Sequence, residues 1–292
     1  MTDGSTDPAG HSESETDKVT VVVMTRDRWT DLQRSLPRHR APVVLVDNGS
    51  RDGTPDAVRQ RFPHVKVVEA DRNLGAMARN IGVALATTEY VAFADDDSWW
   101  APGSLVRAAE LLDSDPRLGL VAGCVLIGQQ ARADPVCIQM RDSPLPAEPG
   151  LPGPAIMGFP ACGAVVRRQA YQAAGGFDDV VFFLGEEERL ALDLASLGWR
   201  MAYVEDLLAH HYPSESRNRA QREVRIRRNA LLTAVMRRPW SIVARAAVRL
   251  LRDGATGRRA LVAAAWVLPK ALVRRRRVPQ QVERAARLLE NG

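Results

Sequence analysis

Three consecutive aspartates, Asp95 to Asp97, follow the apolar run Tyr90–Ala94. Adjacent carboxylates at the end of a buried strand repel one another unless a cation lies between them. Hard divalent ions such as Mg²⁺ and Mn²⁺ bind carboxylate oxygens and bridge them to phosphates, so they can stabilise the charge on a departing diphosphate. By itself the triplet is also typical of a solvated acidic turn. The prediction of a metal site therefore depends on its surroundings.

Two more polar segments follow apolar runs. Residues 47–54 (DNGSRDGT) come directly after 42–46. Asp47 there can accept hydrogen bonds from a nucleobase or ribose, although the composition also fits a plain turn. Residues 73–80 (NLGAMARN) begin a helix with small side chains that allow a ligand to approach the backbone. Arg79 in this segment can pair with a phosphate or with a neighbouring acid.

The segments that must position these side chains alternate between strand and helix patterns. Strands are predicted at 19–25, 42–46, 65–69, 90–94, 118–127 and 201–204, and helices at 29–38, 54–62, 74–86, 102–113, 167–174, 186–197 and from 217 onward. This alternation predicts an α/β fold with a Rossmann-type, mostly parallel central sheet flanked by helices. Ligands bind at the carboxyl ends of the strands in such sheets, so Asp47 and Asp95 are expected at one edge.

Composition divides the chain into three parts. Residues 1–17 carry five acids, no basic residue and no apolar stretch, so we expect a disordered acidic tail without an export signal. A main domain is expected over 18–215, with a proline-rich loop at 141–160. A basic helical extension is expected over 216–292. The three cysteines are far apart in the sequence, which fits buried free thiols in a reducing compartment.

The C-terminal third is strongly basic. Residues 217–287 hold 20 Lys and Arg against three acids, which leaves the remainder at −12 for an overall charge of +5. Residues 240–252 form an amphipathic pattern. It places Trp240, Val243, Ala247, Leu250 and Leu251 towards one face and Arg245, Arg249 and Arg252 on another. Such helices are typical of binding to an anionic membrane surface. An ordinary helical subdomain with a solvated arginine face explains the pattern equally well.

The motifs together resemble a known family. VVVMTRDR, VDNGSRDGT, NLGAMARNIG and FADDD, in this order, are similar to the nucleotide-binding half of family 2 glycosyltransferases with the GT-A fold. The match continues in GFPACGAVVRRQAYQAAGGFDD and FFLGEEERLALDLASLGWR, so it runs from about residue 19 to about 214. The resemblance implies a nucleotide-binding half at 18–100 and an acceptor and catalytic half at 101–215.

The resemblance also implies an activity. A hexosyl or deoxyhexosyl group would move from a UDP- or dTDP-sugar to a hydroxyl of a carbohydrate or lipid-linked acceptor, with inversion and with Mn²⁺ or Mg²⁺ as cofactor. Such reactions serve cell-envelope polysaccharide or glycolipid synthesis in bacteria. We therefore expect a cytoplasmic protein, with docking of the basic helices to the inner face of the plasma membrane as a further expectation.

The family pattern assigns site residues position by position. Nucleotide-sugar contacts are expected from Thr25, Arg26, Asp47, Asn48, Asn73, Gly75, Arg79, Asp95 and Asp96, metal ligands from Asp97, Asp95, His210 and His211, and acceptor contacts from Trp99, Trp100 and Glu188. Either histidine could instead contact the diphosphate, and so could Arg217 and Arg219. Trp99 and Trp100 also fit simple packing against the next helix.

The general base is expected in the run Glu186-Glu187-Glu188, with Glu187 as the first candidate and Glu186 as the second. The family usually carries Glu-Asp here, and it often has Asn where this chain has Arg26. Because glutamate is longer than aspartate, the choice among the three carboxylates stays open.

Two other classes of function compete with an active transferase. The altered glutamate run is compatible with a degenerate transferase fold that acts as a binding partner. A nucleic-acid-binding protein is disfavoured, because the basic tail has little aromatic interleaving and no helix-turn-helix signature. A dinucleotide-binding oxidoreductase is disfavoured because no GxGxxG follows the first strand.

Overall fold

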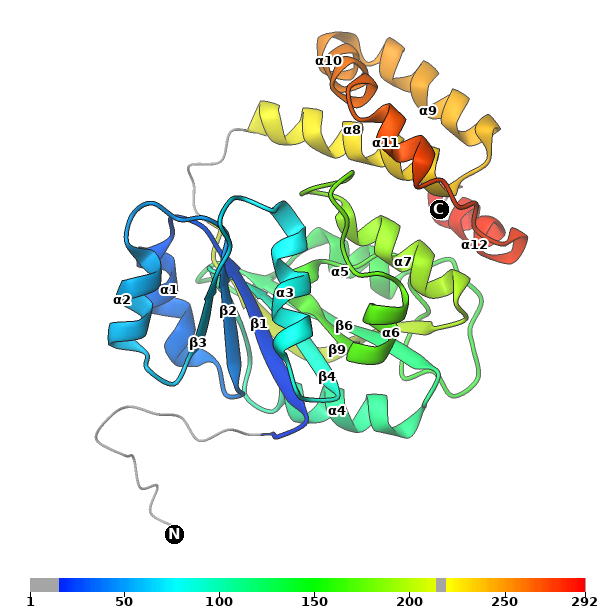
Figure 1. Cartoon of the computed structure of the whole chain (residues 1–292). Helices are drawn as coiled ribbons and strands as arrows, with labels where there is room; N and C mark the ends of the chain where they lie inside the picture. Colours follow the sequence, from blue (N-terminus) through cyan, green and yellow to red (C-terminus); the bar gives the residue numbers. More distant parts are fainter. Residues whose placement is uncertain (1–15, 214–218, 292) are drawn as a thin grey trace.

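The computed structural model describes residues 16–213 and 219–291, and its centre is one mixed sheet (Figure 1). The sheet order is β3-β2-β1-β4-β8-β6-β9-β5, with β7 paired to β6. The strands are β1 (Val19–Thr25), β2 (Val43–Asp47), β3 (Lys66–Glu69), β4 (Tyr90–Asp95), β5 (Ser98–Trp100), β6 (Leu118–Ile127), β7 (Arg132–Ala133), β8 (Ala164–Arg167) and β9 (Arg200–His211).

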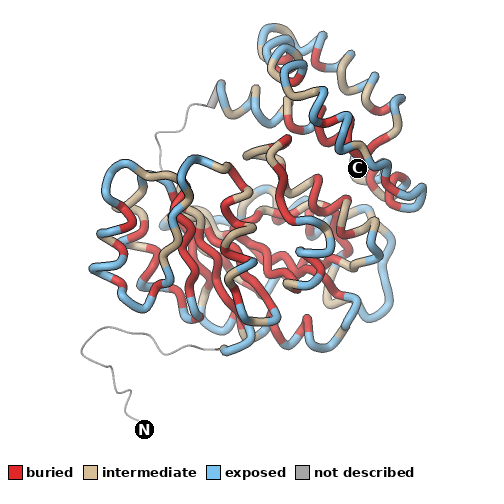
Figure 2. Tube along the Cα trace, in the orientation of Figure 1, coloured by how far each residue is buried: buried red, intermediate tan, exposed pale blue. Residues whose placement is uncertain are grey.

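The first four strands confirm the predicted parallel arrangement. β1 pairs in parallel with β2 and β4, and β2 with β3. In this register Thr25 lies beside Asp47 and Met24 beside Asp95, so both acids end their strands at the same edge. Val19, Val21, Val22 and Val23 are fully buried, because helices cover both faces of a parallel sheet. Figure 2 shows the buried residues concentrated along these strands.

The second half of the sheet differs from the prediction. The short strands β5, β7 and β8 were not expected, and β8 and β5 pair antiparallel to their neighbours. Strand β9 continues through residues 205–206, where a turn was expected, so His210 and His211 lie within the strand and not after it. Strand β9 can continue because residues 208–211 pair in parallel with β6. The register of this pairing shifts at a bulge between Gly123 and Cys124.

In the described part of the main domain there are seven α-helices. They are α1 (Trp29–Ser35), α2 (Thr54–Arg61), α3 (Ala78–Leu85), α4 (Ser104–Ser114), α5 (Pro135–Arg141), α6 (Arg168–Ala173) and α7 (Glu186–Ser196). All except α5 lie within predicted segments or one residue beyond them. The predicted helix at 74–86 begins as a 3₁₀ turn at Gly75–Met77. Cys124, Cys137 and Cys162 are buried free thiols, as expected.

Five helices follow from Arg219: α8 (Arg219–Arg237), α9 (Trp240–Arg252), α10 (Gly254–Ala265), α11 (Leu268–Val273) and α12 (Gln280–Asn291). Helices α8 to α11 share an apolar cluster with Val180 and Val181 of the main domain. Helix α12 instead adds Val282 and Ala286 to the main core. No helix in the described ranges combines the length and the hydropathy that a membrane span needs.

The orientation of α9 agrees in part with the prediction. Its bounds are those expected, and Leu250 is buried with Val243 and Ala247 packed against the same apolar cluster, as predicted. Trp240 and Leu251, which were expected on this face, are 56% and 57% exposed, so a second apolar strip faces solvent.

Helix α8 holds the segment that leads into α7. Phe182 and Leu184 have positive φ angles of 63° and 74°, a conformation that bulky residues rarely adopt. The buried side chain of Asn229 in α8 donates hydrogen bonds to the carbonyl oxygens of Phe183 (2.8 Å) and Leu184 (2.6 Å). On the other side, the Ala76 amide donates to the Phe182 carbonyl over 2.6 Å.

Replacing Asn229 with Ala is expected to lower the free energy of unfolding by about 1–3 kcal/mol, because two carbonyls lose their donors. It should also speed hydrogen exchange at the Ala76 amide, which we would measure by NMR. Asn229→Asp is the matched control: it keeps the size but removes the donors, so it should be at least as unstable. A loss below about 0.5 kcal/mol, the range of ordinary surface substitutions, would contradict this assignment.

Candidate active site

A cavity of about 830 Å³ opens at the carboxyl ends of β1, β2 and β4. Most of the predicted site residues line it: Thr25, Arg26, Asn48, Asn73, Gly75, Arg79, Asp95, Asp96, Asp97, Glu186, Glu187 and His211. We call this space the main cavity. Its position is the one that a parallel sheet favours for ligands.

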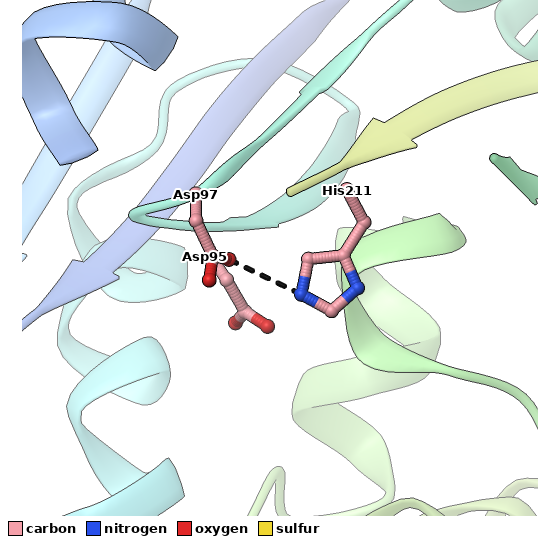
Figure 3. Close-up of side chains that lie close together, drawn as sticks. All are labelled: Asp95, Asp97 and His211. Atoms are coloured by element: carbon pink, nitrogen blue, oxygen red, sulfur yellow. Dashed lines mark ion pairs between the residues drawn. The ribbon is translucent and has the colours of Figure 1, made fainter. Parts of the chain in front are cut away.

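Asp95, Asp97 and His211 form a compact group in the main cavity (Figure 3). One ligand atom from each lies within 4.8 Å of those of the other two, and His211 Nε2 is 3.2 Å from Asp97 Oδ1. Asp97 is almost completely buried, and a buried carboxylate needs a compensating charge. Two carboxylates and an imidazole are a donor set that suits a divalent ion such as Mn²⁺.

Strand pairing selects His211 over His210. Strand β5 is antiparallel to β9, with Ser98 opposite His211 and Trp99 opposite His210. Successive strand residues point to opposite faces, so only one of the two histidines can face Asp97. His210 stacks on Trp99 at 5.5 Å between ring centroids and does not line the main cavity. We call Asp95, Asp97 and His211 the metal group. The structure does not bring His210, which was also predicted as a ligand, to this group.

A buried arginine joins the two halves of the site. Arg79 in α3 contacts Asp95 Oδ1 at 2.6 Å and Glu186 Oε1 at 3.3 Å. Burial opposes the charged form of Arg79, but attraction to Asp95, Glu186 and Glu187 outweighs it and raises the pKa of the guanidinium. Of the two partners left open by the sequence, phosphate or acid, the structure thus places acids against Arg79.

The carboxylates around Arg79 differ in their surroundings. Burial and then repulsion from Glu187 raise the pKa of Glu186 to about 8, and burial also raises the pKa of Glu187. Burial, with repulsion from Asp97 and Asp95, raises the pKa of Asp96 well above its usual value. The Asp96 carboxyl accepts a hydrogen bond from the Thr25 hydroxyl over 3.3 Å, so it faces β1 and not the metal group.

The loops beside β1 are fixed by side-chain amides. Asn48 donates to the Gly75 carbonyl over 3.0 Å and accepts from the Leu74 amide over 2.6 Å, and Asn73 accepts from the Gly75 amide over 2.9 Å. Gly75 has φ = +60°, and a Cβ at this position would lie 2.3 Å from the Phe182 carbonyl oxygen. Only glycine allows the backbone of residues 182–185 to approach the 3₁₀ turn at Gly75.

Besides His210, four predicted site residues lie outside the lining of the main cavity. Both carboxylate oxygens of Asp47 accept hydrogen bonds from Ser50, one from its amide over 2.8 Å. Trp100 is buried and donates to the Phe93 carbonyl over 3.2 Å, and Trp99 stacks between His210 and Tyr212. Glu188 lines a different cavity, on the other side of α7.

The structure also adds residues that the sequence reasoning missed. Gln221, Arg222, Arg225 and Ile226 of α8 line the main cavity. Arg217 lies outside the described residues, and of Arg219 only the helical backbone is described. The i, i+3 spacing of Arg222 and Arg225, which places them on one helix face, was the available signal, but nothing local indicated that this face would meet the strand ends.

Comparisons with known proteins identify the family of the chain. The family model described as "Glycosyl transferase family 2" matches residues 20–175, more than half of the chain. The chain is 28% identical over 244 residues to the N-acetylglucosaminyl-diphospho-decaprenol L-rhamnosyltransferase of Mycobacterium tuberculosis, covering 70% of this chain and 79% of the relative. It is 29% identical over 226 residues to the pre-mycofactocin glycosyltransferase of that species, covering 72% of this chain and 46% of the relative.

Solved structures show the same fold. A mannosyltransferase from Pyrobaculum calidifontis, in complex with GDP-Man and Mn²⁺, superposes with a TM-score of 0.58 at 23% identity, over 88% of this chain and 73% of that one. Staphylococcus aureus TarS with UDP-GlcNAc gives 0.58 at 18% identity, over 88% and 72%. The resemblance in the motifs is thereby confirmed: the chain belongs to glycosyl transferase family 2 and has the GT-A fold.

Proposed function

We propose that this glycosyltransferase moves a hexose or deoxyhexose from a UDP- or dTDP-sugar to a hydroxyl group of a lipid-linked acceptor, with inversion, in cell-envelope synthesis. The observation that carries the proposal is the group Asp95, Asp97 and His211 inside a cavity of about 830 Å³. A relative named for a diphospho-decaprenol acceptor and a fold neighbour named with GDP-Man and Mn²⁺ support it.

Charge in the cavity fits a nucleoside diphosphate. A divalent ion on Asp95, Asp97 and His211 would neutralise negative charge that develops on the leaving diphosphate. Arg222 and Arg225 line the cavity from α8 and add positive charge where phosphate oxygens need donors. The imidazole favours Mn²⁺ over Mg²⁺, since Mg²⁺ sites are built mainly from carboxylates, phosphates and water.

Glu187 is the stronger candidate for the base that removes the proton of the acceptor hydroxyl. It lines the main cavity and is only partly buried, so it can reach a ligand there. Glu186 lines the cavity too, but one of its oxygens pairs with Arg79, so its position depends on that contact. A base must lie within hydrogen-bond reach of the proton it accepts, and Glu188 lines the other cavity.

The metal group is tested by comparing the two adjacent histidines. In wild type, UDP or dTDP with Mn²⁺ should raise the melting temperature, read by scanning fluorimetry. His211→Ala and Asp97→Ala should lose this Mn²⁺-dependent rise, because each removes a ligand. His210→Ala is the matched control and should keep it, since His210 stacks on Trp99 outside the cavity.

A donor-hydrolysis screen over UDP-, dTDP- and GDP-sugars, read as released nucleotide, identifies the nucleotide. Failure of every nucleotide to bind would overturn the proposal. Binding without turnover on any acceptor would instead favour the degenerate fold that serves as a binding partner.

Glu187→Gln is expected to lower the transfer rate by about 10²–10⁴-fold, the usual contribution of a general base. Donor affinity, measured by calorimetry with Mn²⁺ present, should change less than about twofold because the amide keeps the side-chain shape. Retained transfer in this variant would show that the base is Glu186 or Glu188. Replacing each of these two residues with Gln would then show which one it is.

We also propose that the protein docks peripherally on an anionic membrane. The solvent-facing side of α9 carries Trp240, Val248 and Leu251, all exposed, and Arg245, Arg249 and Arg252 lie beside them on the same helix. An apolar strip next to a row of arginines fits the interface of an anionic bilayer. This strip is the side of α9 opposite to Ile242 and Leu250, which pack inward.

Reversing the three arginines of α9 to Glu should weaken sedimentation with phosphatidylglycerol vesicles by at least about 1 kcal/mol for each arginine. Binding to phosphatidylcholine vesicles should stay weak throughout. The control carries the same charge change on exposed arginines of the main domain, Arg61, Arg117 and Arg132. Equal losses in both triple variants would show that net charge alone, and not this surface, attracts the protein.

A further inference from the structure

A second cavity of about 700 Å³ lies on the far side of α7 from the metal group. Its walls come from α5, the proline-rich segment before residue 158, α7 and α12. Val136 of α5 lines both this cavity and the main cavity, so the two spaces are neighbours across a single side chain. We call it the second cavity.

The walls of the second cavity are largely apolar. Its apolar lining includes Ile138, Met140, Ile156, Met157, Leu192 and Leu289. Ile138 is among the exposed large apolar residues of the protein, so this side of the cavity opens to solvent. A space of a few hundred Å³ or more with such walls is of the size and kind that binds apolar small molecules.

The charged groups in the second cavity do not favour an anion. Arg238 pairs with Glu283 at 2.6 Å and with Glu290 at 2.8 Å, so two carboxylates balance its charge. Glu188 also lines the cavity, and burial, partly offset by Arg238, raises its pKa to about 7. With Asp142 as the remaining charged residue of the lining, a phosphate would meet more carboxylates than unpaired cations.

The first turn of α7 separates the two cavities. Glu187 lines the main cavity and Glu188 lines the second one, because successive helix residues differ by about 100° in direction. A ligand with one end in each cavity would therefore have the proposed base, Glu187, in the wall around its main-cavity end.

We propose that the second cavity binds the uncharged apolar chain of the acceptor, whose hydroxyl-bearing end lies in the main cavity. The inference rests on the proposed function, because it assigns the place of the lipid part of that acceptor. Two observations argue for an aliphatic chain over a sugar phosphate or a peptide. Val136 lines both cavities, and the walls of the second cavity are apolar and lack an unpaired cation.

Leu289 and Leu288 offer a matched test on α12. Leu289 lines the second cavity, whereas Leu288 is 45% exposed and does not line it. The probe is a neutral dansyl-labelled farnesyl amide, titrated by fluorescence against the full chain. Leu289→Glu should weaken its binding about tenfold or more, because a charge enters an apolar wall, and Leu288→Glu should change it less than about twofold.

A second variant is needed because Leu289→Glu could weaken probe binding simply by destabilising α12. Gly158 lines the second cavity, and a Cβ built there meets no atom within 4 Å, so Gly158→Trp can fill the space without a backbone clash. It should block the probe as well. Leu197→Trp adds the same side chain at an exposed position outside the cavity and should not.

Donor binding separates this inference from the proposed function. Calorimetry with UDP or dTDP and Mn²⁺ should give the same affinity in wild type and in all four variants. Donor binding in wild type without saturable binding of the farnesyl probe would overturn the inference and leave the proposed function intact. Equal probe affinity in wild type, Leu289→Glu and Gly158→Trp would also overturn it, since the probe would then bind elsewhere. Absence of donor binding in wild type would overturn both.

Discussion

The buried guanidinium of Arg79 is the contact on which the site depends. It lies between Asp95 at the end of β4 and Glu186 at the start of α7, so one cation fixes residues that are about 90 positions apart in the sequence. Without it, Asp95, Asp96, Asp97, Glu186 and Glu187 would leave several negative charges close together in the lining of one cavity. A buried cation left without its acids, or the acids left without it, would cost several kcal/mol, of the order of 3–5. The charge of Arg79 therefore stabilises both an acid of the metal group and the glutamates at the start of α7.

The C-terminal extension is part of this site and not an appendage to it. Helix α8 supplies Arg222 and Arg225 to the main cavity, and its Asn229 holds the strained segment that leads into Glu186. Helix α12 closes the second cavity with Leu289 and Glu290 and packs Ala286 into the main core. Helix α8 packs against α9, so it connects the surface on which a membrane is proposed to lie with the main cavity. A chain cut before Arg219 would lack walls of both cavities.

The two cavities differ in the charged residues that line them. The main cavity holds both acids and arginines, whereas the one arginine that lines the second cavity is paired with carboxylates. Such a division suits a substrate with a polar reacting end and an apolar tail, because each end is desolvated only where its surroundings can replace water. The two cavities meet at Val136 of α5 and at the first turn of α7, where consecutive glutamates line different cavities.

The order of strands and helices from β1 to β4, the place of the acids at the carboxyl ends of β2 and β4, and the family were all predictable from the sequence. Local apolar patterns determine the elements, and parallel pairing brings their ends together. Which neighbouring side chain enters the site was decided only by tertiary structure. The register of β5 against β9 turned His211, and not His210, towards Asp97. The rotation of α7, held by Arg79, placed Glu187 and Glu188 in separate cavities. Both outcomes depend on contacts between residues about 100 positions apart, and no local pattern contains them.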